Sequence, residues 1–146
     1  MAEKTPLEQK EKVLFLCTGN SARSQMAEGL LRHLAGERFE VYSAGTRPGA
    51  VRAEAVAVMR ELGIDISGQR SKSVDEFLGR PFDFVITVCD HARETCPVFP
   101  GPARRIHWSL DDPAAASGDE PERLAIFRRV RDELASLIRE FIQGRA

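Results

Sequence analysis

A cysteine and an arginine separated by five residues are the first feature of this sequence that can carry chemistry. Cys17 ends the apolar run KVLFLC, the small and polar residues TGNSA follow, and Arg23 begins a stretch with helical spacing. Gly19 and Asn20 tolerate positive φ, so the intervening segment can curl tightly. Its backbone N–H groups would then point inward, at the positive end of the helix. The sequence therefore predicts an anion-binding loop.

The same arrangement favours Cys17 as a nucleophile. A free thiol has a pKa of about 8.5, which a helix N-terminus and a neighbouring arginine lower to between about 3.5 and 7.5. We therefore expect Cys17 to be largely thiolate at neutral pH. Arg23 offers a planar fork that matches two oxygens of a tetrahedral oxyanion, and Ser24 is close enough to donate a hydrogen bond to the sulfur. The alternative is a buried strand-end thiol beside a surface arginine; strand, turn and helix together favour the nucleophile.

Two further cysteines follow a later strand. Cys89 ends the run FDFVITVC and Cys96 lies seven residues on. If residues 90–96 form a helical turn, seven residues rise ~10.5 Å, whereas a disulfide tolerates at most about 7 Å between Cα atoms. A bond between these thiols would therefore require the turn to unwind. Spacing alone leaves a redox relay and two unrelated core thiols equally open.

A pair of carboxylates follows the last strand candidate. Asp111 and Asp112 stand in DDPA, directly after RRIHWSL. A carboxylic acid placed over the loop could protonate a leaving oxygen. The other interpretation is an Asx turn before Pro113, which is a common structure.

The elements that must position these residues alternate between strand and helix. Such alternation predicts an α/β fold with three layers, in which helices cover both faces of a four-stranded parallel sheet. Ligands bind such sheets at the carboxyl ends of the strands, where Cys17 and Cys89 lie. Residues 1–11 are expected to be a flexible extension and residues 12–146 a single domain. We expect strands over 12–17, 39–45, 82–89 and 104–110, and helices near 23–35, 55–62, 71–79 and 121–143.

Helical spacing also predicts which side of the last helix is buried. Phe127, Val130 and Leu134 recur on one face and should meet the core. Arg128 and Arg131 lie off that face, so we expect them to point largely toward water.

Composition excludes several classes of protein. The 146 residues carry a formal net charge of −1, without the basic excess of a nucleic-acid binder. No apolar run approaches the ~20 residues that span a bilayer. The polar start lacks a signal peptide, which predicts a cytoplasmic protein without membrane contact. Three cysteines in a reducing compartment do not form a disulfide scaffold, and His33, His91 and His107 lack the paired spacing of a metal site.

These motifs together resemble a known family. CTGNSARSQMAEG is similar to the C-x₅-R-S phosphate loop of the low-molecular-weight tyrosine phosphatase fold, and still more similar to the thioredoxin-coupled arsenate reductases built on that fold. The resemblance covers nearly the whole chain from residue 12, including VYSAG, DIS, VCDHARETCP, HWSLDDPA and FRRVRDEL. The chain departs from the phosphatases at Gln25, where they typically have proline. It departs from many reductases at Ala22, where they carry a further cysteine that the thiol relay does not use.

The resemblance implies a substrate and a set of roles. Cys17, assisted by Ser24, would attack arsenate, an oxyanion similar to phosphate and sulfate, and Asp112 rather than Asp111 would protonate the departing oxygen. Cys89 would then attack the adduct and Cys96 would carry the oxidation outward to thioredoxin. No metal or other cofactor is implied, and we expect a monomer. The implied substrate-binding residues are Thr18, Gly19, Asn20, Ser21, Ala22 and Arg23.

Two other functions remain open. The first is a low-molecular-weight phosphomonoesterase or protein tyrosine phosphatase, and the second is a non-catalytic oxyanion or redox sensor. Tyrosine phosphatases of this fold tend to carry aromatic residues after the Asp-Pro pair, whereas residues 114–116 are alanines. That difference favours a small inorganic oxyanion over an aryl phosphate.

Overall fold

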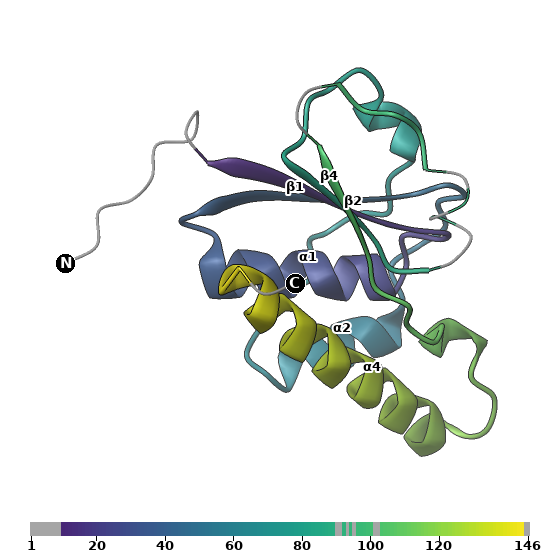
Figure 1. Cartoon of the computed structure of the whole chain (residues 1–146). Coiled ribbons are helices and arrows are strands. Elements are labelled where there is room, and N and C mark those ends of the chain that lie inside the picture. Colours follow the sequence, from purple (N-terminus) through teal and green to yellow (C-terminus); the bar gives the residue numbers. More distant parts are fainter. Residues whose placement is uncertain (1–9, 90–91, 93, 95, 101–102, 145–146) are drawn as a thin grey trace.

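The structure, a computed structural model, describes residues 10–89, 92, 94, 96–100 and 103–144. Within this part of the chain, four strands form one parallel sheet in the order β2-β1-β3-β4 (Figure 1). The strands are β1 (Glu11–Cys17), β2 (Phe39–Gly45), β3 (Phe84–Thr87) and β4 (Arg104–His107). The helices are α1 (Arg23–Ala35), α2 (Ala53–Arg60) and α4 (Glu120–Ile142), with short 3-10 helices η2 (Val74–Phe77) and η3 (Pro113–Ala115).

The strand order places the first and third strands side by side. The chain passes from β1 to β2 on one side, then returns to add β3 on the other side of β1. The loops that follow β1 and β3 therefore diverge from neighbouring strand ends, which is the position where open parallel sheets bind ligands. Register pairs Cys17 with Gly45 and Leu16 with Thr87, so Cys89 follows directly beside the end of β1.

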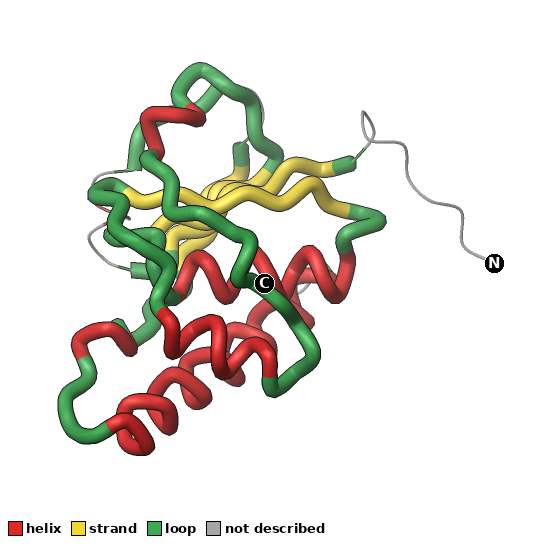
Figure 2. The backbone as a smooth tube through the Cα atoms, turned by 180° about the vertical axis from the view of Figure 1, so that it is seen from behind, coloured by secondary structure: helices red, strands yellow, loops and turns green. Residues whose placement is uncertain are grey.

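Helical segments cover both faces of the sheet, as predicted, but unequally. Figure 1 shows α1, α2 and α4 together under the sheet and η2 above it, and Figure 2 shows the same division from behind. Aromatic contacts trace the two layers. On the α4 side, Trp108 lies between Phe15 and Phe141, with ring centroids 6.1 and 6.4 Å away. On the other side, Tyr42 meets Phe77 of η2 at 5.6 Å. The predicted fold class is therefore confirmed.

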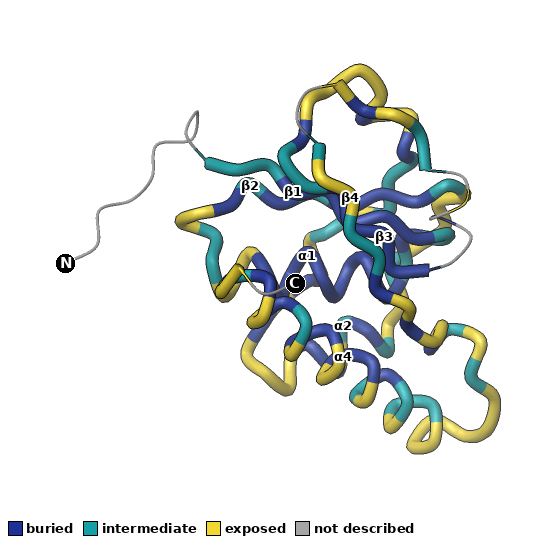
Figure 3. The backbone as a smooth tube through the Cα atoms, in the orientation of Figure 1, coloured by how far each residue is buried: buried dark blue, intermediate teal, exposed yellow. Residues whose placement is uncertain are grey.

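The central elements are almost entirely buried. Residues 13–17 of β1 are buried, which is why the strand reads as a continuous apolar run instead of an alternating one. Residues 23–31 of α1 are also buried, because α4 packs along this helix and covers its outer side. Figure 3 shows the buried residues concentrated along the strands and α1, with exposed residues on the outer turns of α4.

The helix predicted over 71–79 is shorter than expected. Only η2 forms, and it begins after Ser73, whose side chain caps it by accepting a hydrogen bond from Asp75 N. The chain leaves the helix at Leu78, whose ψ of 136° is extended, and Gly79 follows with a left-handed φ of 80°.

The prediction for Arg131 is wrong. Its side chain is buried, donates a hydrogen bond to Val58 O at 2.8 Å and pairs with Glu61 at 2.7 Å. This arginine joins α4 to α2, since its guanidinium donates to a carbonyl in the last turn of the shorter helix. Burial of a charge is tolerated here because hydrogen bonds and an opposite charge compensate it.

Two predicted segments fall partly outside the described residues. Within the turn expected over 90–96, Ala92 and Glu94 are helical, while residues 90, 91, 93 and 95 are not described. Of the extension expected over 1–11, residues 1–9 are not described, and β1 already begins at Glu11. In the described ranges, no helix is both long and apolar enough to cross a membrane.

Candidate active site

The backbone of the loop after β1 is held from outside by the segment that follows β2. Four loop carbonyls accept hydrogen bonds from backbone N–H groups of residues 46–52. On the inner side of the loop, Asn20 N donates to Cys17 Sγ at 3.1 Å. The four bonds are Thr46 N to Cys17 O (3.2 Å), Arg47 N to Thr18 O (2.8 Å), Gly49 N to Gly19 O (3.0 Å) and Arg52 N to Ser21 O (2.9 Å).

Asn20 supplies the tight turn of the loop. It is the one non-glycine residue with positive φ in the described part of the chain, at 47°. Asparagine tolerates this left-handed conformation better than most residues. Gly19 does not adopt positive φ, so the expectation that both residues would supply the turn holds for Asn20 alone.

Gly45, at the end of β2, is required by close approach. A Cβ at this position would lie 2.5 Å from Thr18 O and 2.8 Å from Asn20 N. Neither backbone atom can move without opening the loop. The sequence identified Gly45 only as the end of a strand.

The buried Asn20 side chain holds the loop through hydrogen bonds to four other residues. Its amide nitrogen donates to Ser24 Oγ at 2.7 Å and Ser43 Oγ at 2.9 Å. Its oxygen accepts from Gln25 Nε2 at 2.9 Å and Lys72 N at 2.7 Å. Gln25, at the position where the phosphatases typically have proline, also donates to Asn20 O at 3.0 Å. Because this buried polar cluster is so fully bonded, it specifies one loop conformation.

A buried carboxylate continues this cluster. Glu28 accepts a hydrogen bond from Ser43 Oγ at 2.5 Å and pairs with Arg32 at 2.8 Å and with Lys72 at 3.5 Å. Its side chain is only 6% exposed. The two cations compensate the charge, so Glu28 can orient Ser43, which in turn bonds Asn20.

Cys17 lies at the bottom of the loop, where Ser24 Oγ is 2.8 Å from its sulfur. Burial raises the pKa of the Cys17 thiol above its ordinary value, against the opposing effects of the Ser24 hydrogen bonds, the Arg23 charge and the Asn20 amide. The prediction of a thiolate at neutral pH is therefore wrong for this conformation. The sequence identified the groups that lower the pKa, but it gave no measure of how deeply the sulfur is buried.

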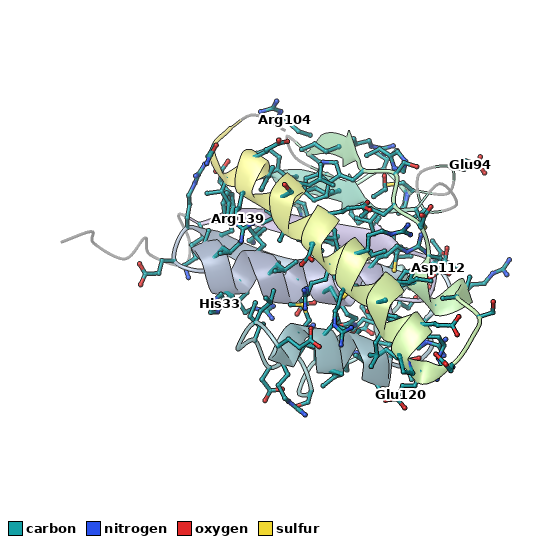
Figure 4. All side chains as sticks on the ribbon, turned by 90° about the horizontal axis from the view of Figure 1, so that it is seen from below. His33, Glu94, Arg104, Asp112, Glu120 and Arg139 are labelled. Carbon is teal, nitrogen blue, oxygen red and sulfur yellow. The ribbon has the colours of Figure 1, made fainter. Side chains whose placement is uncertain are left out.

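Arg23 and Asp112 face one another across the loop. Arg23 Nη2 lies 3.7 Å from Asp112 Oδ2, and Arg23 Nη1 donates to Leu110 O at 3.1 Å. Asp112 also caps η3 by accepting from Ala114 N at 3.0 Å, so the Asx turn and the placement over the loop occur together. Asp111 points elsewhere and pairs with Arg129 of α4 at 2.8 Å. Figure 4 shows Asp112 at the opposite end of the molecule from His33 and Arg139.

The start of α1 offers the backbone donors that the sequence predicted. Ala22 precedes the helix without any side-chain cap, and the first turn carries no acidic residue. The first N–H groups of a helix lack intrahelical acceptors, and among them the Ser24 N–H forms a hydrogen bond with the Cys17 sulfur. An oxyanion above Cys17 would therefore meet the positive end of α1 as well as Arg23.

Cys89 lies against the loop and Cys96 lies farther along the same segment. Cys89 Sγ is 3.3 Å from Thr18 Oγ1 and accepts from Ala92 N at 3.3 Å. All three cysteines are free thiols; Cys17 and Cys89 are buried, while Cys96 is half-buried. Because most residues between Cys89 and Cys96 are not described, the unwinding of that turn stays a prediction. Across the described residues, no group of His, Cys, Asp and Glu is arranged to hold a metal ion.

Several residues of the site were missed by the sequence analysis. Ser43 and Gly45 stand in VYSAG, whose likeness to the family was the only signal available for them. Gln25 was noted as a departure from the phosphatases, without a role. Lys72 and Arg52 gave no local signal, because their contacts join segments that are distant along the chain. Arg52 donates to Ala114 O at 3.0 Å and so links the loop clamp to the turn that carries Asp112.

Comparison with known proteins agrees with this geometry. An arsenate reductase from Halalkalibacterium halodurans is 48% identical over 134 residues, which is 92% of this chain and 96% of that protein. A solved structure of an arsenate reductase in the phosphate binding state superposes with a TM-score of 0.76 at 34% identity and covers 93% of this chain and 99% of that one.

A second similar solved structure is of a reductase whose name includes its reductant. The thioredoxin-dependent arsenate reductase of Corynebacterium glutamicum superposes with a TM-score of 0.74 at 29% identity and covers 95% of this chain and 63% of that one. The low molecular weight phosphotyrosine protein phosphatase model matches residues 12–144. The family model thus covers nearly the whole described chain, and the chain belongs to the low molecular weight phosphotyrosine protein phosphatase family.

Proposed function

We propose that this protein is an arsenate reductase in which Cys17, Cys89 and Cys96 form a thiol relay that thioredoxin regenerates. The observation that carries the relay is the contact of Cys89 Sγ with Thr18 Oγ1, because it places a second free thiol beside the nucleophile loop. The names of the similar proteins support arsenate as the substrate and thioredoxin as the reductant.

The first step is a substitution at arsenic. Arsenate has the shape and charge of phosphate, so the loop amides of residues 18–23 and the Arg23 guanidinium would bind it. Because burial favours the protonated Cys17 thiol, this step requires the thiol to lose its proton first. The resulting thiolate forms a bond from sulfur to arsenic, and one arsenate hydroxyl departs as water after it takes a proton from Asp112. Arsenic remains at oxidation state five in this adduct.

The second step reduces arsenic. The Cys89 thiolate attacks Cys17 Sγ, the bond from sulfur to arsenic breaks, and its electron pair stays on arsenic. Arsenite leaves with arsenic in oxidation state three, and the two thiols become a Cys17–Cys89 disulfide. Phosphorus does not accept an electron pair in this way under cellular conditions, so this step would distinguish arsenate from phosphate.

The third step restores the nucleophile. The Cys96 thiolate attacks Cys89 Sγ, which releases the Cys17 thiolate and leaves a Cys89–Cys96 disulfide. A dithiol of thioredoxin then reduces that bond by the same kind of exchange. Dependence on thioredoxin fits the predicted cytoplasmic, reducing location; the monomeric state and the single domain over 12–146 stay predictions as well.

Phosphatase activity is the second candidate function. The family relationship and the pairing of Arg23 with Asp112 favour it, because a phosphomonoesterase needs only a nucleophile, a clamp and an acid. The small Ala114 and Ala115 follow Pro113, and neither supplies a ring to flank an aryl group. We therefore expect phosphatase activity to be a side reaction.

The experiment compares Cys89→Ala and Cys17→Ser with the unaltered protein on two substrates. Arsenate is supplied with thioredoxin, thioredoxin reductase and NADPH, and para-nitrophenyl phosphate is assayed separately. Cys17→Ser should abolish both activities, whereas Cys89→Ala should abolish NADPH consumption and spare phosphate release. A sensor would consume one equivalent and stop, and equal loss of both activities in Cys89→Ala would show that Cys89 is structural.

A further inference from the structure

Cys96 borders a pocket on the sheet face that η2 covers. The pocket has a volume of about 340 Å³ and lies over the ends of β3 and β4. A pocket of this size admits water and small reagents to the half-buried thiol. Its lining residues are Val85, Thr87, Cys96, Arg105, Ile106 and His107.

An arginine in this pocket holds the backbone next to the thiol. Arg105 Nη2 donates to Pro97 O at 3.0 Å, and the Cys96 thiol donates to the same carbonyl at 3.5 Å. The guanidinium and the sulfur therefore converge on one oxygen. When Cys96 loses its proton it can no longer donate to Pro97 O, and the positive charge beside it then stabilises the thiolate.

The charges around Cys96 agree with this arrangement. Burial raises the pKa of the Cys96 thiol, and the charge of Arg105 acts in the opposite direction. Among the described residues of the pocket, His107 is the other titratable group, and its Nδ1 is 2.7 Å from Thr87 Oγ1. β3 contributes only uncharged side chains to the lining.

We propose that Arg105 is a positioning residue that activates Cys96 for the last thiol exchange. This inference rests on the proposed relay. In that exchange the Cys96 thiol first releases its proton to solvent, and the thiolate attacks Cys89 Sγ. The Cys89–Cys96 bond forms as the Cys17–Cys89 bond breaks, and Cys17 leaves as a thiolate, so no further oxidant or reductant is needed.

The chain provides a matched control in the preceding residue. Arg104 carries the same charge and is also exposed, but successive side chains of a strand point to opposite faces. Its guanidinium lies 5.6 Å from the Phe84 ring centroid instead of beside Cys96. Arg104→Ala therefore removes a neighbouring positive charge without removing the contact to Pro97 O.

The expected signature is a pair of crossing pH profiles. A higher thiol pKa lowers the thiolate fraction, but each thiolate becomes more nucleophilic. The Brønsted coefficient for such attack is about 0.4–0.5. At a pH below the thiol pKa, the attack rate therefore falls about three- to fourfold for each unit by which the pKa is raised. At a pH above the thiol pKa, the attack rate instead rises about threefold per unit. Arg105→Ala should therefore react more slowly than the unaltered protein at neutral pH and faster at high pH.

The experiment measures alkylation of Cys96 by iodoacetamide in the reduced, full-length protein, with mass spectrometry to resolve the Cys96 peptide. Arg105→Ala should give the crossing profile, Arg105→Lys should restore most of the unaltered profile because it keeps the charge, and Arg104→Ala should match the unaltered protein. Coincident profiles for Arg105→Ala and the unaltered protein would overturn the inference. Slower alkylation of Cys96 in Arg105→Ala by the same factor at every pH would also overturn the inference, because it would indicate that Arg105 has only a packing role.

Turnover assays separate this inference from the proposed function. In Arg105→Ala, the first equivalent of arsenite should form at the unaltered rate, while the Cys17–Cys89 disulfide accumulates and steady-state turnover falls. If Cys96→Ser sustains full turnover, the relay itself is wrong, whatever the alkylation profiles show. If Cys96→Ser stops turnover and Arg105→Ala leaves both disulfide accumulation and alkylation unchanged, only the role of Arg105 is wrong.

Discussion

Cys17 Sγ and Ser24 Oγ lie 2.8 Å apart, at the end of β1 and in the first turn of α1. Neither side chain has appreciable contact with solvent. The serine hydroxyl also accepts a hydrogen bond from Asn20 Nδ2, so its own proton is free to point at the sulfur. The hydroxyl therefore offsets part of the cost of burying a thiolate.

Ser24→Ala should move the reactivity of Cys17 to higher pH. The hydrogen bond from the Ser24 side chain lowers the pKa of Cys17, so its removal raises that pKa, although the backbone hydrogen bond of residue 24 remains. Fewer molecules then carry the thiolate at any pH below the raised pKa. Iodoacetamide alkylation of Cys17 across a pH series measures the shift. Ser21→Ala, in the same loop, is the control. An unshifted profile in Ser24→Ala would mean that the hydroxyl does not stabilise the thiolate.

Gly45→Ala should damage the loop without removing any catalytic group. Its Cβ would lie 2.5 Å from Thr18 O, and overpacking of this kind costs about 1–3 kcal/mol of unfolding free energy. The free energy of unfolding, measured with denaturant, and the rate of arsenate turnover should both fall. Gly49→Ala is the matched control, because a Cβ there meets no atom within 4 Å. Equal stability and turnover in the two variants would contradict the close approach.

Arg23→Lys should fail although it keeps the charge. The guanidinium can donate to Leu110 O from one nitrogen and face Asp112 with the other, and a lysine ammonium cannot reproduce this fork. Loss of an oxyanion donor typically costs about 100- to 1,000-fold in rate, and we expect kcat/KM for arsenate to fall by this order. Steady-state kinetics of Arg23→Lys test this prediction, with Arg47→Lys, at an exposed position, as the control. Near-normal kinetics of Arg23→Lys would show that Arg23 does not bind the oxyanion through its fork.

Asp112→Asn should separate acid chemistry from turn structure. The amide oxygen can still accept from Ala114 N and cap η3, but the side chain can no longer protonate a leaving oxygen. General acid catalysis contributes about 100- to 10,000-fold, so a loss within that range is expected for the first step. A rapid-mixing assay of arsenite release measures it. Asp111→Asn should remain close to normal, because Asp111 pairs with Arg129; a comparable loss there would reassign the acid.

The sequence alone determined the features that depend on neighbouring residues. The apolar run before Cys17, the Asn20 turn and the helical spacing from Arg23 are local, and together they predicted the loop. The alternation of strands and helices predicted the parallel sheet and the carboxyl edge on which Cys17 and Cys89 lie. Strand and helix periods are set by residues within a few positions of each other, so they can be read without knowledge of the fold.

The tertiary structure decided everything that joins distant segments. Lys72 lies 52 positions from Asn20, and Arg131 lies 70 positions from Glu61, so no local pattern marks either contact. The depth at which Cys17 is buried likewise depends on the packed chain, and burial outweighed the Ser24 hydrogen bonds and the Arg23 charge that the sequence had identified. A motif gives the order of donors and charges along the chain. The desolvation that decides how far they shift a pKa arises only when the chain packs.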